Sequence, residues 1–185
     1  MIRLCSASPT RAQLLRGAGI AYTQSPVDFD EEAITASSAK AFVYHAAKGK
    51  LEAAERHYGL AMPLLCADTV IAAHDGTILR KARNVEEARA ILLRQSGSTI
   101  AIITSMHYKR DDLYLSDISA THYRFAPFDP EDLERYLRSG AWEGKAGACM
   151  VEGFCQPYIQ EVRGLQSTAM GLQVEVLHPW LEGDR

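Results

Sequence analysis

The chain has 185 residues, of which 23 are acidic, 20 are basic and 47% are hydrophobic, for a net charge of −3. This length allows a core large enough to fold without disulfides or a structural metal. The slightly acidic balance and the lack of a long basic run argue against nonspecific nucleic-acid binding. No stretch reads as a signal peptide or a membrane span, so we expect a cytoplasmic protein.

Predicted strands and helices alternate along the chain, separated by capping and turn residues. Ser8-Pro9 is a helix cap followed by proline in the first helical turn. Asn84 and Glu87 resemble a capping box. The predicted helices run from Ser8 to Gly17, from Ser37 or Ser38 to Gly59, from Val85 to Gln95, from Asp129 to Gly140 and from Val174 to Leu181. The predicted strands cover residues 2–5, 21–26, 64–73, 99–108, 113–125 and 157–162.

This order mixes helices with hairpins. It favours an α/β or α+β fold around a mixed sheet rather than a purely doubly wound one. We expect a single domain over residues 1–185.

The four cysteines show no C-x-x-C spacing, so neither a zinc ribbon nor a thioredoxin-type motif is indicated. Cys5, Cys66 and Cys149 lie among apolar residues. We expect buried, reduced thiols at these positions, which fits a reducing cytoplasm.

Asp68 interrupts the most apolar predicted strand, within the sequence Cys66-Ala67-Asp68-Thr69-Val70. A buried carboxylate is costly unless it is paired, bound to metal or placed at a strand end. A site carboxylate that binds a cation or activates water would explain it. Hydrogen bonds to backbone amides at a strand end are the alternative, and the pattern alone does not separate the two.

A second candidate region is the helix start in Ser6-Ala7-Ser8-Pro9-Thr10-Arg11. Free N–H groups and the helix dipole attract phosphate at such a start. Arg11 could grip phosphate oxygens in bidentate fashion. Taken alone, an ordinary cap with a solvated arginine is the more frequent arrangement.

Further charged residues offer weaker signals. Lys48, Lys50 and Lys81 could each reach a phosphate, and Glu31 or Glu32 in the acidic loop could bind Mg²⁺. Each of these five charged residues could equally be an ordinary solvated surface residue.

Residues 144–147 form a glycine-rich stretch shortly before Glu152. Its glycines would allow backbone to approach a ligand, or simply form a tight turn. Zinc-hydrolase, P-loop, dinucleotide and nucleophile-elbow motifs are absent from the sequence.

Taken in order, these segments resemble the Maf family of nucleotide pyrophosphatases. The opening segment is similar to the family pattern L-A-S-x-S-P-R-R-x-x-L-L, and Ala67-Asp68-Thr69-Val70 is similar to A-D-T-V. The resemblance covers nearly the whole chain. Its other segments are Phe29-Asp30-Glu31, Ala47-Lys48, Leu79-Arg80-Lys81-Ala82, Ala146-Gly147-Ala148, Glu152-Gly153-Phe154 and Met170-Gly171-Leu172.

The resemblance implies an elongated Maf-like mixed sheet flanked by helices, with two lobes and a central cleft. It implies a Mg²⁺ or Mn²⁺ ion and water attack at the α-phosphorus of a nucleoside triphosphate. Asp68 would be the general base and, with Glu31, would hold metal or water. Arg11, Lys48 and Lys81 would hold the triphosphate. The remaining substrate contacts would come from Ser6, Ser8, Thr10 and Glu152.

Five positions depart from the family pattern, namely Thr10, Ala82, Cys149, Glu152 and Gln173. Glu152 replaces a glutamine and matches a second branch of the family, which prefers 7-methyl-GTP to thymidine or uridine triphosphates. A carboxylate accepts hydrogen bonds from guanine, whereas an amide both donates and accepts. The preferred base therefore stays open between a pyrimidine and a modified purine.

Two other readings compete with the enzyme. A nucleotide-binding regulator of cell division that has lost catalysis would explain the departures, but it has no need of a base at Asp68. A structural domain without a site leaves Asp68 unexplained. We therefore favour a house-cleaning pyrophosphatase. A homodimer is expected only from the general frequency of two-fold assemblies.

Overall fold

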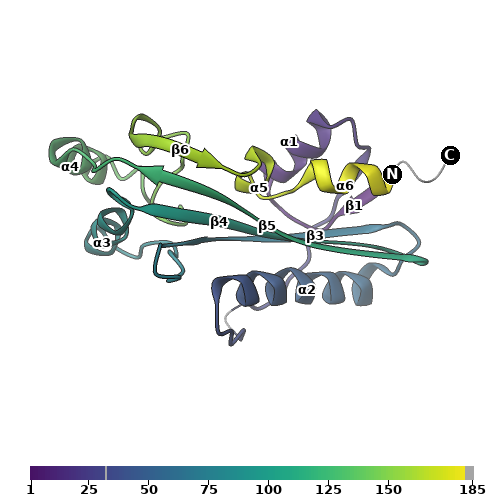
Figure 1. The fold of residues 1–185 in the computed structure, drawn as a ribbon. Coiled ribbons are helices and arrows are strands. Elements are labelled where there is room, and N and C mark those ends of the chain that lie inside the picture. Colours follow the sequence, from purple (N-terminus) through teal and green to yellow (C-terminus); the bar gives the residue numbers. More distant parts are fainter. Residues whose placement is uncertain (32, 182–185) are drawn as a thin grey trace. The chain divides into compact units, whose positions relative to one another are not determined.

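The structure is a computed structural model that describes residues 1–31 and 33–181 (Figure 1). The strands are β1 (Ile2–Leu4), β2 (Tyr22–Gln24), β3 (Leu64–Ala72), β4 (Thr99–Arg110), β5 (Leu113–Phe125) and β6 (Ile159–Arg163). The helices are α1 (Pro9–Gly17), α2 (Ala39–Tyr58), α3 (Val85–Gln95), α4 (Pro130–Arg138), the 3-10 helix η1 (Gln156–Tyr158), α5 (Gln166–Ala169) and α6 (Val174–Leu181).

The strands form one six-stranded sheet with the order β2-β1-β3-β4-β5-β6. β1 pairs in parallel with β2 and β3, whereas β5 and β6 are antiparallel. This mixed sheet with its flanking helices confirms the expected α/β fold class.

The chain divides into two compact units. Unit 1 comprises Met1–Thr69, Ile103–Ala120 and Leu165–Arg185, and unit 2 comprises Val70–Ile102 and Thr121–Gly164. The backbones of β3, β4 and β5 each run from one unit into the other.

Side-chain caps start the helices where the sequence predicts them. Ser8 and Ser38 each accept a hydrogen bond from the amide three residues later, at 3.3 and 3.1 Å. Asn84 does the same for Glu87 at 2.9 Å, and Asp129 caps α4. These bonds satisfy amides that the helix itself leaves without partners. Among the described residues, no helix has both the length and the apolar character needed to cross a bilayer.

The core of unit 1 has two sides because side chains alternate along β3. Leu65 and Ala67 belong to a cluster with residues of α1 and α6, and Leu64 and Cys66 belong to a second cluster with residues of α2. In Figure 1, α2 lies on one side of the sheet of this unit, and α1 and α6 lie on the other. The same alternation directs Asp68 toward the α2 side.

Two differences from the predicted elements have local causes. The expected strand over 157–162 begins instead with η1, since Pro157 has no amide hydrogen for a strand ladder; β6 starts only at Ile159. The helix α5 has four residues, too few for a periodic pattern to indicate it.

Cys149 forms a disulfide with Cys155, which corrects the expectation of a reduced thiol at this position. The chain turns back between them, where the Gly153 amide donates to the Met150 carbonyl at 3.0 Å. This turn brings the two Cα atoms to 6.8 Å, within reach of a disulfide. Neither the apolar neighbours of a cysteine nor C-x-x-C spacing reveals such a turn in the sequence. Cys5 and Cys66 are free and buried, as predicted.

Candidate active site

Two carboxylates of unit 1 converge on the ammonium group of Lys50. Its Nζ lies 2.6 Å from Asp68 Oδ1 and 2.5 Å from Glu31 Oε1. The Asp68 side chain is 9% exposed, against 41% for Glu31. Burial raises the pKa of Asp68 and the positive charge of Lys50 opposes that shift. The ion pair explains how β3 accommodates a carboxylate among apolar residues.

On α2, the structure brings Lys50 rather than Lys48 into this cluster. Lys50 follows the buried Ala46 and Ala47 by four and three residues, so it continues the stripe of α2 that faces the sheet. Lys48 is 46% exposed, and its Nζ lies 3.8 Å from Glu52 Oε1. Extending the apolar periodicity of the helix to its lysines would have selected Lys50 from the sequence.

A glycine on α2 positions the acidic loop. The ring of Phe29 packs so closely against Gly49 that a Cβ at this position would overlap it. Phe29 lies two residues before Glu31, and Gly49 directly precedes Lys50. The contact therefore helps to bring the loop carboxylate to the ammonium group. Glu32, the second metal candidate of this loop, lies outside the described residues.

Arg11 lies in the first turn of α1, and its guanidinium is held by three acceptors. Nε donates to the Gly171 carbonyl at 2.8 Å. The two terminal nitrogens donate to Ser6 Oγ at 3.1 Å and to Thr69 Oγ1 at 3.2 Å. The Ser8 amide also donates to Ser6 Oγ at 3.2 Å. These bonds fix the arginine, both serines and the helix start as one assembly.

A chain of hydroxyl groups continues from Arg11 into the core of unit 1. Thr104 donates to the Thr168 carbonyl at 2.7 Å, so Thr69 must be the donor in its 2.9 Å bond to Thr104. Gln173 donates to the Thr104 carbonyl at 2.7 Å. Thr69 and Asp68 are neighbours on β3, so one strand serves both the arginine and the carboxylate. Thr104 and Thr168 could not be identified from the sequence, because a single buried threonine carries no pattern.

Thr10 lies beside Arg11 in the first turn of α1 and is partly buried. In this position it supplies a hydroxyl group where the family pattern has the first of its two arginines.

The other predicted site residues, Lys81 and Glu152, belong to unit 2. Lys81 forms an antiparallel bridge with Ala146 and is exposed. Glu152 is also exposed, on the loop between the two disulfide-bonded cysteines. Burial raises the pKa of Tyr123, and the charge of Glu152 adds to that shift, which places this carboxylate near Tyr123.

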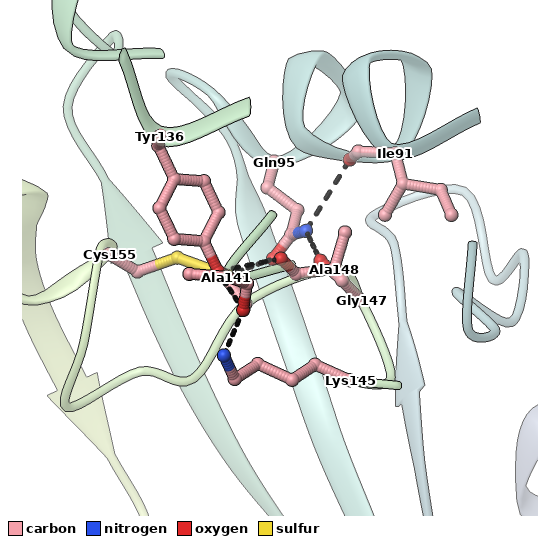
Figure 2. The surroundings of a disulfide bond; sticks show 9 residues. Ile91, Gln95, Tyr136, Ala141, Lys145, Gly147, Ala148 and Cys155 are labelled. Atoms are coloured by element: carbon pink, nitrogen blue, oxygen red, sulfur yellow. Dashed lines mark hydrogen bonds between the residues drawn. A yellow bond between two sulfur atoms is a disulfide. The ribbon is translucent and has the colours of Figure 1, made fainter. Parts of the chain in front are cut away.

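Neutral side chains hold the backbone at Gly147 and Ala148 (Figure 2). Gly147 and Ala148 have φ values of 67° and 56°, a left-handed conformation that is strained for alanine. Gln95 donates to the Gly147 carbonyl at 2.6 Å, and Tyr136 donates to the Ala148 carbonyl at 3.0 Å. Gln95 is fully buried at the end of α3, and no sequence pattern indicates its role.

The carboxylates of Glu31 and Asp68 are the predicted ligands for a divalent ion. Within residues 1–31 and 33–181, no three or more His, Cys, Asp or Glu side chains are grouped to hold a metal. Mg²⁺ commonly uses one or two carboxylates together with substrate phosphates and water. Two carboxylates that already converge on one cationic group fit that requirement.

Comparison with known proteins gives a consistent family. The family model described as Maf-like protein matches residues 1–183. A nucleoside triphosphate pyrophosphatase from a Nitratiruptor species is 58% identical over 179 residues, which cover 96% of each chain. A protein of the same name from Helicobacter pylori is 38% identical over 174 residues, covering 94% of this chain and 91% of that relative.

Two further matches carry more specific names. A dTTP/UTP pyrophosphatase from a Polaromonas species is 36% identical over 181 residues, covering 92% of this chain and 89% of that relative. The crystal structure of a nucleoside-triphosphatase, or dITP/XTP pyrophosphatase, from Mycobacterium abscessus matches with a TM-score of 0.49 at 16% identity, covering 97% of this chain and 90% of that chain. Since the family model spans almost the entire sequence, the chain belongs to the Maf family.

Proposed function

We propose that this chain is a hydrolase that cleaves a nucleoside triphosphate to the monophosphate and pyrophosphate. The observation that carries the proposal is the convergence of Lys50, Glu31 and the buried Asp68 in a member of the Maf family. The names of its relatives from Nitratiruptor and Helicobacter pylori support the same activity.

Asp68 acts as the general base in this proposal. It takes a proton from a water molecule, whose oxygen attacks the α-phosphorus while pyrophosphate leaves. Burial makes Asp68 a stronger base than an exposed aspartate, because it raises the pKa of the carboxyl group. Lys50 keeps the carboxylate ionised and oriented, and its charge stabilises the negative charge that develops on the phosphate oxygens.

The α1 start binds phosphate in this proposal. Arg11 retains one N–H on each terminal nitrogen beyond its bonds to Ser6 and Thr69, and the helix dipole favours an anion at the same end. Ser8 and Thr10 contribute hydroxyl groups in the first turn. Because Lys50 lies against Asp68, we assign to it the role that the resemblance gave to Lys48.

Lys81 supplies a further positive charge for the triphosphate. Glu31 and Asp68 would hold the Mg²⁺ or Mn²⁺ ion, which neutralises charge on the phosphate oxygens when it is bound.

Glu152 contacts the nucleobase in this proposal. The relative named dTTP/UTP pyrophosphatase supports a pyrimidine substrate. The carboxylate of Glu152 instead favours a donor-rich base, as in 7-methyl-GTP. These two substrate classes are the ones to compare first.

Pyrophosphate release across a panel of nucleotides tests the proposal. The panel contains the canonical triphosphates, dTTP and 7-methyl-GTP, each with Mg²⁺ or Mn²⁺ and each repeated in EDTA. We expect metal-dependent release from at least one nucleotide, with the monophosphate in equal amount. Tight nucleotide binding without release from any of them would support the regulator instead.

We also propose a house-cleaning role in the cytoplasm and assembly as a homodimer. Light scattering at several protein concentrations measures the second point directly, because a monomeric mass throughout would exclude the dimer.

A further inference from the structure

The Cys149–Cys155 disulfide closes the loop that carries Glu152 (Figure 2). The loop is exposed at Glu152 and Gly153, and Met150 is 43% exposed. The cysteines themselves are buried, at 4% and 0% exposure. The disulfide is therefore buried and joins the two ends of an exposed loop.

The side of the loop that ends at Cys155 has an anchor of its own. The Phe154 ring stacks on Tyr136 with a centroid distance of 4.4 Å and meets Phe128 edge-on at 5.1 Å. Aromatic pairs of this kind contribute to stability beyond the area that they bury. This anchor does not depend on the sulfur atoms.

The side that begins at Cys149 is anchored separately. Gln95 and Tyr136 bind the carbonyls of Gly147 and Ala148, and the Gly147 amide donates to the Leu79 carbonyl at 3.1 Å. Figure 2 shows Gln95 and Tyr136 around the disulfide. Both ends of the loop would thus stay in place without the covalent bond, while the exposed segment between them would gain freedom.

We propose that Cys149 and Cys155 form a reversible redox-modification site that sets the affinity for the nucleotide. The disulfide holds Glu152 in the position in which it contacts the nucleobase. Reduction of the disulfide lets the Glu152 segment move. This inference rests on the proposed function, in which Glu152 contacts the base. Ordering a loop on binding reduces affinity, so the oxidised chain binds more tightly than the reduced chain.

The modifying agent is a dithiol reductant. One of its thiolates attacks a cysteine sulfur, which forms a mixed disulfide and releases the other cysteine as a thiolate that takes a proton. The second thiol of the reductant then displaces the remaining cysteine and leaves with a disulfide of its own. The protein gains two electrons and two protons, and the reductant loses them. Because both sulfur atoms are buried, attack requires a transient opening of the loop.

The affinity and the redox equilibrium must be linked. If oxidation tightens nucleotide binding by some factor, saturating nucleotide must shift the thiol–disulfide equilibrium toward the disulfide by the same factor. The probe is the α,β-imido analogue of the preferred triphosphate, which the chain cannot hydrolyse. Calorimetry gives Kd for the oxidised and the dithiothreitol-reduced chain. Mass spectrometry after alkylation gives the redox equilibrium with and without the probe.

We expect reduction to raise Kd roughly three- to tenfold, the cost of ordering one or two side chains. Saturating nucleotide analogue should shift the thiol–disulfide equilibrium toward the disulfide by the same factor. Equal Kd values in the two states, or rapid alkylation of both cysteines in the chain purified without reductant, would overturn the inference.

Two variants assign the effect to this pair of cysteines. The double variant Cys149→Ser/Cys155→Ser should bind like the reduced chain and lose its response to dithiothreitol. A variant with Cys5→Ala and Cys66→Ala should keep the response. If the serine variant does not fold, the linkage measurement on the unmodified chain still decides.

Failure of the inference is distinguishable from failure of the proposed function. Redox-dependent binding without pyrophosphate release from any nucleotide would contradict the proposed function but not the inference. Normal release with redox-independent binding would remove the inference alone.

Discussion

The two units hold their candidate site residues by different means. In unit 1, an ion pair holds Asp68, and charge-assisted hydrogen bonds from the guanidinium to Gly171 and Thr69 hold Arg11. In unit 2, Lys81 and Glu152 are exposed, and neutral groups and a disulfide hold the backbone between them. Groups that take part in proton transfer require fixed orientation and altered pKa values, whereas groups that recognise a ligand require access. In the proposed function, the groups for proton transfer lie in unit 1, and Glu152, the proposed contact for the nucleobase, lies in unit 2.

The largest expected effect is on Asp68. Asp68→Asn removes the base and keeps the size of the side chain, so kcat should fall about 10²–10⁴-fold while the fold is retained. Steady-state pyrophosphate release gives kcat, and circular dichroism checks the fold. Near-normal turnover in this variant would show that Asp68 is not the general base.

Lys50→Met should have the next largest effect, paired with Lys48→Met as its control on the same helix. Loss of the Lys50 charge should lower kcat/KM about 10²-fold. It should also destabilise the chain by about 1–3 kcal/mol, because a buried carboxylate loses its partner. Within the described residues, Lys48 forms its ion pair with Glu52 at the surface, so its removal should change kcat/KM by less than about twofold. Equal effects at both positions would contradict the assignment of Lys50.

Glu152→Gln tests the recognition side of the comparison. We expect the ratio of kcat/KM for 7-methyl-GTP to that for dTTP to fall roughly tenfold, as a lost hydrogen bond to a charged group would cause. The kcat for the better substrate should stay within about threefold, since this residue takes no part in proton transfer. A large loss of kcat with unchanged selectivity would place Glu152 in the chemistry instead.

Gly49→Ala should have a smaller effect that separates positioning from helix propensity. Alanine normally stabilises a helix relative to glycine by about 1 kcal/mol, but here its Cβ would displace Phe29 and with it the Glu31 loop. We expect kcat/KM to fall roughly fivefold, with no gain in Tm. Gly17→Ala is the matched control, because a Cβ there meets nothing within 4 Å. Its activity should be unchanged.

The smallest effect concerns acid stability and leaves activity at neutral pH unchanged. Burial lowers the pKa of His107 from 6.5 to about 4, and the charge of Lys48 adds to that shift. The unfolded chain takes up this proton near pH 6.5, whereas the folded chain stays neutral until about pH 4. The unfolding free energy should therefore decrease by about 3 kcal/mol as the pH falls through that interval, and it should not change through this group above it.

Denaturant unfolding between pH 4 and pH 7.5 measures this contribution. The slope of the unfolding free energy against pH should become shallower in His107→Gln. It should persist in His122→Gln, because His122 is exposed. An unchanged slope in the first variant would contradict the role of His107.

Much of the fold could be predicted because local signals agree with the packing. Caps at Ser8, Ser38 and Asn84 start helices where the sequence indicates them, and the apolar stretch around Asp68 is the strand β3. Asp68 was identifiable because a carboxylate in an apolar strand requires a partner. The apolar periodicity of α2 indicates that Lys50 rather than Lys48 lies toward the core. That this face of α2 meets Asp68 depends on contacts between segments distant in sequence, which no local pattern indicates.

Other features depend on contacts that no local pattern records. The Thr69–Thr104 hydrogen bond joins residues 35 positions apart, and Gln95 meets Gly147 across 52 positions. The Cys149–Cys155 bond depends on a turn between the two residues rather than on a recognised spacing. Single polar residues in such contacts have no periodicity of their own.

The most direct test of the central claim uses the unmodified chain and its preferred nucleotide in water enriched in ¹⁸O. Water attack at the α-phosphorus places the solvent oxygen on the nucleoside monophosphate and leaves pyrophosphate unlabelled. Mass spectrometry of both products should therefore find one ¹⁸O in the monophosphate and none in pyrophosphate. Label in pyrophosphate, or release of orthophosphate in its place, would contradict hydrolysis at the α-phosphorus.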